Sequence, residues 1–105
     1  MNKKPTTTTN HTITYAAAIA AAQEAINASI KEAGNAATAS AETLAEMVSA
    51  YGGINLRASV AVCAYTLGFR ASNHDCHGST LQDNERAGRW AQRAALAAFE
   101  RASSL

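Results

Sequence analysis

Alanine constrains the fold of this chain more than any other feature. It makes up about a quarter of the 105 residues and is concentrated in two runs, at residues 15–22 and 90–98. Alanine has the highest helix propensity, and its single methyl group lets helices pack closely. We therefore predict an all-α fold, a small bundle of about four helices with alanine-rich packing seams.

Length and composition narrow the class of protein. A chain of 105 residues corresponds to one domain with one core. Charged residues make up 16% and the net charge is +1, so the chain has no general attraction to nucleic acid or to anionic lipid. The two cysteines form no Cys-x-x-Cys pair, which is typical of a reduced, cytoplasmic protein. A secretory signal is disfavoured, because residues 6–11 separate Lys3-Lys4 from an apolar run that is mostly alanine. A membrane span is disfavoured, because Gln23, Glu24 and Asn27 interrupt that run.

The chain divides into a short polar segment and a longer helical one. We predict a flexible, threonine-rich tail at residues 1–12 and a single helical-bundle domain at residues 13–105. The segments with helical periodicity run over about residues 14–33, 40–51, 55–69 and 80–103. The breaks between them are Gly34-Asn35, Gly52-Gly53 and a polar loop at residues 71–79. The alternation of apolar residues at 56–69 also suits a buried strand, so this segment could form either a helix or a strand.

Helical spacing identifies core residues and helix caps. Asn55 is the predicted N-cap of the third segment, and Thr80 with Asp83, or Ser79 with Gln82, forms a capping box before the last one. The residues predicted to face the core of the first three segments are Tyr15, Ile19, Ala22, Ile26, Ile30, Ala33, Leu44, Met47, Val48, Tyr51, Leu56, Val60, Cys63 or Ala64, and Leu67.

The last helical segment has two contrasting faces. One is a strip of small residues, which predicts close packing against another helix: Ala87, Gly88, Ala91, Ala95, Ala98 and Ala102. The other is basic and aromatic, and we predict that it binds a partner: Trp90, Arg86, Arg89, Arg93 and Arg101. The alternative is that Trp90 packs into the bundle while Arg86 and Arg89 pair with Asp83 and Glu85.

Cysteine and histidine residues supply a second candidate site. Cys63, His74, Cys76 and His77 could bind zinc, but Cys76 and His77 are adjacent, whereas zinc ligands usually come in pairs two or more residues apart. Cys76 could instead be a nucleophile activated by a histidine, although no residue that would orient the base is evident. We therefore expect no metal, no cofactor and no enzymatic activity, and interpret the segment as a solvated connection.

Two further patterns suggest other functions. Residues 40–51, the Gly52-Gly53 turn and the following segment have the lengths of a helix-turn-helix, but apolar residues follow Arg57 where base-reading side chains are needed. Residues 85–94 resemble the C-terminal helix of small phage proteins that sequester cyclic nucleotides. That resemblance implies a helical oligomer with Trp90 and Arg93 in a helical hairpin or ligand pocket at a subunit interface.

These observations favour a non-enzymatic binding protein that occupies the surface of a macromolecular partner, as a regulator, an adaptor or a phage-type inhibitor does. A protein partner and a homo-oligomer are expected, the latter because several alanines of the first helix lie away from its isoleucine stripe: Ala17, Ala20, Ala21 and Ala28. The alternatives are a nucleotide binder with its ligand between subunits and a helix-turn-helix protein that binds DNA. No contact with a membrane is expected.

Overall fold

The chain is described by a computed structural model, which covers residues 3–32, 41–52, 55–75 and 80–103. Its helices are α1 (Lys3–Glu32), α2 (Ala41–Tyr51), α3 (Leu56–Asp75) and α4 (Leu81–Ser103). The predicted all-α bundle is confirmed. Residues 56–69, for which both a helix and a strand were considered, are helical.

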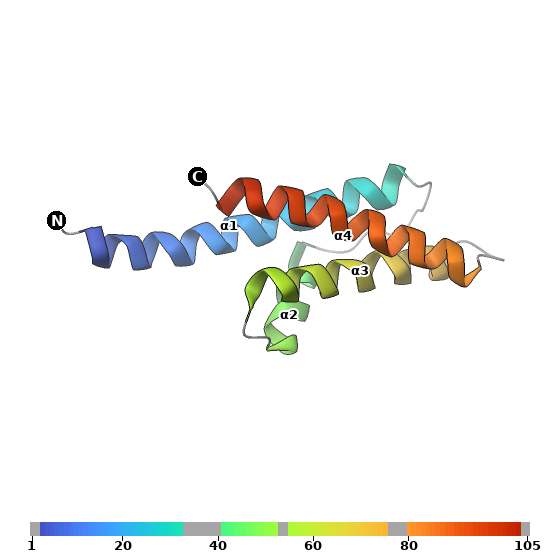
Figure 1. Cartoon of the computed structure of the whole chain (residues 1–105), viewed down its shortest axis with the longest axis horizontal. Helices are drawn as coiled ribbons and strands as arrows, with labels where there is room; N and C mark the ends of the chain where they lie inside the picture. Colours follow the sequence, from blue (N-terminus) through green and yellow to red (C-terminus); the bar gives the residue numbers. More distant parts are fainter. Residues whose placement is uncertain (1–2, 33–40, 53–54, 76–79, 104–105) are drawn as a thin grey trace.

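Helix α4 is the central helix of the bundle, because it packs lengthwise against both α1 and α3 (Figure 1). It runs in the opposite direction to both of them, while α2 crosses beneath and contacts α1 and α3. The molecule is elongated, with extents of 58 × 23 × 18 Å, and the N-terminal part of α1 projects beyond the end of α4.

The core follows part of the predicted alanine seam, because Ala87, Ala98 and Ala102 are only partly buried. Ala91 and Ala95 of α4 are fully buried, and Gly88 is buried beside them. From the other helices, the predicted residues that are buried include Ala22, Ile26, Ile30, Leu44, Val48, Val60, Cys63, Ala64 and Leu67. The alanine methyls thus occupy the centre of the bundle, where they allow the backbones to come close.

Two of the predicted core residues are exposed, Ile19, Met47 and Leu56 are partly buried against the core, and Ala33 lies outside the described residues. Tyr51 is 55% exposed, because it is the last residue of α2 and that end of the helix projects away from the other helices (Figure 1). Tyr15 lies at the edge of the core and stacks on Phe99, with the ring centroids 6.4 Å apart. Phe99 itself is buried, and the wheel of small residues on α4 did not identify it.

The contact between α3 and α4 is so close that it requires glycine on both helices. A Cβ atom on Gly68 would lie 2.6 Å from the carbonyl oxygen of Ala87 and 2.7 Å from Cβ of Ala91. A Cβ atom on Gly88 would lie 3.0 Å from the ring of Tyr65. One turn further along, the Gln92 side chain donates a hydrogen bond of 3.0 Å to the carbonyl of Ala61. The two helices therefore meet backbone against backbone.

The predicted helix ends are confirmed at three places. Asn55 caps α3, since its Oδ1 accepts the Ala58 N–H at 3.0 Å. Thr80 and Asp83 form the reciprocal capping box of α4, with both hydrogen bonds at 3.1 Å. Gly52 ends α2 with φ of 65° and donates its N–H to the carbonyl of Val48.

Two boundaries differ from the sequence-based expectation. Helix α1 begins at Lys3 and not near Thr14, because Pro5 lies in the first turn, where the missing N–H would have no partner in any case. The backbone of the expected tail is thus helical from Lys3 on, and its flexibility stays a prediction. Helix α3 continues to Asp75, so the prediction of a loop is wrong for residues 71–75. Ala71 and Ser72 are buried and extend the helix.

Other sequence-based boundaries fall outside the described residues. They are the Gly34-Asn35 break, the Ser79 alternative for the capping box, Gly53 and residues 76–79.

Candidate docking face on the last helix

Trp90 lies in the middle of α4 on the side opposite the buried seam, and 42% of its surface is exposed. The alternative in which the indole packs into the bundle is therefore not observed. Residues three and four positions away lie beside it on the helix surface, which places Arg86 and Arg93 next to the ring. We call these three residues, Arg86, Trp90 and Arg93, the Trp90 face.

Small neighbours leave part of the indole uncovered. Ala94 and Ala97 follow Trp90 by one and two helical turns on the same side, and each has only a methyl group to place against the ring. The large side chains that flank Trp90 are the two arginines, and both are exposed. Trp90 lies on this side because the buried side chains of α4, apart from Asn84, are small or apolar and occupy the opposite side of the helix.

The arginines of α4 differ in their ion pairs. Arg86 approaches Asp83 at 4.0 Å in a solvent-exposed pair, which is worth little. Within the described part of the chain, Arg89, Arg93 and Arg101 have no acidic partner within ion-pair distance. The guanidinium of Arg93 is therefore available to a carboxylate or a phosphate from another molecule.

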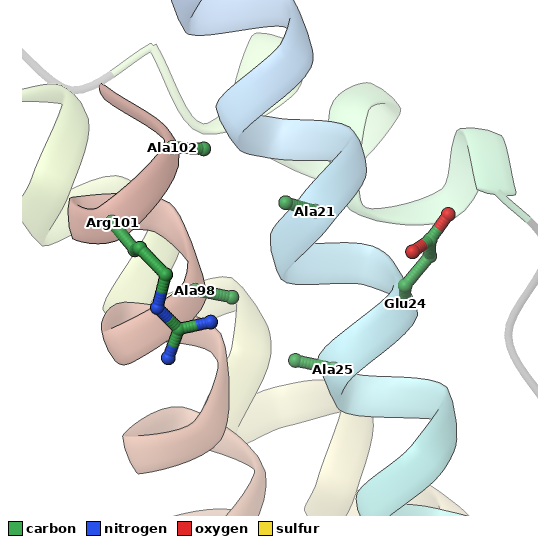
Figure 2. A pocket seen from close by; sticks show the side chains of 6 residues that line it. All are labelled: Ala21, Glu24, Ala25, Ala98, Arg101 and Ala102. Atoms are coloured by element: carbon green, nitrogen blue, oxygen red, sulfur yellow. The ribbon is translucent and has the colours of Figure 1, made fainter. Parts of the chain in front are cut away.

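Two of the predicted arginines do not belong to the Trp90 face. Arg89 precedes Trp90 directly and is therefore rotated by about 100° around the helix. Arg101 follows Trp90 by three turns, which is about 16 Å along the axis. It lines a separate groove between α1 and α4, together with Ala21, Glu24, Ala25, Ala98 and Ala102 (Figure 2). Glu24 was not among the predicted site residues, although it is the one charged residue within the alanine-rich run at residues 15–26.

The cysteine and histidine candidates do not come together where the structure describes them. Cys63 and His74 both belong to α3, and the helical rise separates them by about 16 Å, too far for one metal ion. Burial raises the pKa of the Cys63 thiol, which favours its neutral, unreactive form. Cys76, His77 and the side chain of His74 lie outside the described residues. Among the described residues, no group of three His, Cys, Asp or Glu side chains could hold a metal ion.

The two helices of the possible helix-turn-helix present little to a DNA groove. Arg57, the basic residue in the first turn of α3, forms an ion pair with Glu100 of α4. The pair is solvent-exposed, but the carboxylate of Glu100 offsets the positive charge of the guanidinium. The side chains that follow, Val60, Cys63 and Ala64, are buried in the core.

Comparisons with known proteins give no family for this chain: no family model, no curated protein and no solved structure matches it. None of the helices that the structure describes combines the length and the hydropathy needed to cross a bilayer.

The capping box at the start of α4 should make stability depend on pH in the acid range. The Thr80 backbone N–H, the Thr80 hydroxyl and the charge of Arg86 hold the pKa of Asp83 below its usual value. Because the folded pKa is lower than the unfolded one, the stabilisation is present above about pH 3.9 and is lost as the pH falls through the folded pKa. We expect Asp83→Asn to be less stable than the wild type near neutral pH and to converge with it on acidification. Chemical denaturation from about pH 6 to about pH 2 measures this, and a constant difference between the two proteins would contradict it.

Proposed function

We propose that the protein is a non-enzymatic binding protein that uses the Trp90 face to dock onto a macromolecular partner, in the manner of a small regulator, adaptor or inhibitor. The observation that carries the proposal is the exposed indole between two arginines on a rigid helix. Tryptophan and arginine are the side chains most enriched among residues that dominate binding energy. A helix that is already folded loses little entropy when it binds.

The chemistry of the face indicates what the partner must offer. The indole requires an apolar pocket, because burying its large ring is the main source of affinity. Arg93, which has no ion pair within the described structure, requires a carboxylate near the rim of that pocket. A protein surface with an apolar depression beside acidic side chains meets both conditions.

The two alternatives have less support from the described residues. A nucleotide would need several cations around one cavity, whereas the groove between α1 and α4 places Glu24 across from Arg101. A DNA-binding protein would need a free basic recognition helix, whereas Arg57 of α3 is paired with Glu100.

The test is the double variant Trp90→Ala/Arg93→Ala, used as bait beside the wild type in extracts of the native host. We expect the variant to lose the partner that the wild type captures. With the purified partner, the dissociation constant should rise by about 30-fold or more, because truncating an anchoring tryptophan costs about 2 kcal/mol or more. Isothermal titration calorimetry measures the change.

A matched control separates this face from a general loss of aromatic and basic surface. Tyr51 and Arg70 are also exposed, but they lie on α2 and α3. The variant Tyr51→Ala/Arg70→Ala should bind as the wild type does, and circular dichroism should show the same helicity for all three proteins. Equal binding by the wild type and Trp90→Ala/Arg93→Ala would show that this is not the docking face.

A further inference from the structure

A groove of ≈ 430 Å³ runs between α1 and α4, well away from Trp90 along the helix (Figure 2). Its walls are alanines: Ala21 and Ala25 of α1 point toward Ala98 and Ala102 of α4. Side chains of this size let another helix approach closely. The groove is therefore shaped to accept a helix with equally small side chains.

Charges of opposite sign stand on the two sides of this groove. Glu24 extends from the outer side of α1, and Arg101 extends from α4 (Figure 2). Both side chains are exposed, and neither has an ion-pair partner among the residues that the structure describes. A ligand that fills the groove must thus provide a cation near Glu24 and an anion near Arg101.

We propose that the occupant is a second copy of this chain, placed groove against groove about a twofold axis. In such an interface the same surface is used by both copies, so a contact from one residue to another occurs twice. Glu24 of each copy would then pair with Arg101 of the other. The groove is complementary to itself in charge, and its alanine walls suit the alanine-rich helix that the second copy supplies.

The exposed alanines of α1 continue this surface beyond the groove. Ala17 lies one turn before Ala21 and Ala28 lies one turn after Ala25, so both extend the side of α1 that lines the groove, and Ala20 borders them. All three are exposed. Their methyl groups would be covered by the second copy, which accounts for alanines on the outer side of a helix whose core side carries Ala18, Ala22, Ile26 and Ile30.

The proposal does not rest on the function proposed for the Trp90 face, because neither Trp90 nor Arg93 lines the groove. A dimer of this kind would leave both residues free on each copy. A negative result for one proposal therefore does not affect the other. Subunit association tests the dimer, and partner capture tests the Trp90 face.

Charge reversal tests the pairing directly. Glu24→Arg alone and Arg101→Glu alone should each raise the dissociation constant of the dimer about tenfold or more, because both reciprocal pairs change from attraction to repulsion. An equimolar mixture of the two variants should form a heterodimer about as readily as the wild type forms its dimer, since each cation again meets an anion. Sedimentation equilibrium from micromolar to millimolar protein measures these constants.

Exposed charges elsewhere on the bundle supply the control. Glu46→Arg on α2 and Arg70→Glu on α3 make the same changes of charge outside the groove and should dimerise as the wild type does. The proposal is overturned if the wild type is monomeric throughout this range. It is also overturned if the groove variants associate as the wild type does, or if mixing them fails to restore the dimer. Circular dichroism confirms that each variant is folded.

Discussion

Replacing Gly68 by alanine is expected to lower the free energy of unfolding by about 2 kcal/mol, although alanine is the better helix former. The new methyl group would lie 2.6 Å from the Ala87 carbonyl oxygen and 2.7 Å from the Ala91 methyl group. Neither can move without the α4 backbone, so α3 and α4 must separate. The gain of about 1 kcal/mol in helix propensity does not offset the resulting loss of packing.

Denaturation in urea, followed by circular dichroism, measures the change, and a double-mutant cycle assigns it to this contact. Ala91→Gly removes one of the two clashing groups. Gly68→Ala should therefore lower the free energy of unfolding by less in the Ala91→Gly background than in the wild type. Some loss should remain, because the Ala87 carbonyl stays in place. Equal costs in the two backgrounds, or a Gly68→Ala variant more stable than the wild type, would show that the helices do not touch here.

Local patterns in the sequence predicted those parts of the fold that local interactions determine. The buried seam of α4 follows from the spacing of its small residues, and the caps at Asn55 and Thr80 follow from the preferences of polar side chains at helix starts. Gly68 carries no such signal. From the sequence alone, a glycine inside a helix is expected to destabilise that helix. Only the close approach of α4 explains why glycine stands at this position.

The candidate surfaces were predictable to a similar extent. The position of Trp90 on the outer side of α4 follows from the helical repeat, because the buried positions of that helix are all small or apolar except Asn84. The role of Arg101 does not follow from the repeat. It depends on the packing of α1 against α4, which brings Glu24 and Arg101, far apart in the chain, to one groove.

Gln23 is a residue whose role depends on tertiary structure and could not be predicted from the sequence. In the sequence it interrupts an apolar run and therefore looks like a surface residue. In the structure it is 1% exposed, and its Oε1 accepts the backbone N–H of Leu44 at 2.8 Å. That N–H lies in the first turn of α2, so the Gln23 amide joins α1 to the start of α2.

We expect Gln23→Leu to lower the free energy of unfolding by about 2 kcal/mol at every pH, because the buried Leu44 N–H loses the side-chain oxygen to which it donates. Asn27→Ala is the control. It removes only the 3.2 Å hydrogen bond that Asn27 accepts from Gln23 and should cost about 1 kcal/mol or less. A Gln23→Leu variant within about 0.5 kcal/mol of the wild type would contradict the assignment.

Gln23→Glu should behave differently, because its effect depends on protonation. The neutral acid keeps an oxygen for the Leu44 N–H and an O–H for Asn27, whereas the charged form places an unpaired carboxylate in the core. Burial raises the folded pKa above the unfolded value of about 4.3, so the variant should lose stability as the pH rises through that range. Comparison with the wild type at each pH isolates this effect. A deficit near neutral pH that disappears in acid, absent from Gln23→Leu, would establish that α1 holds the start of α2 through this one buried amide.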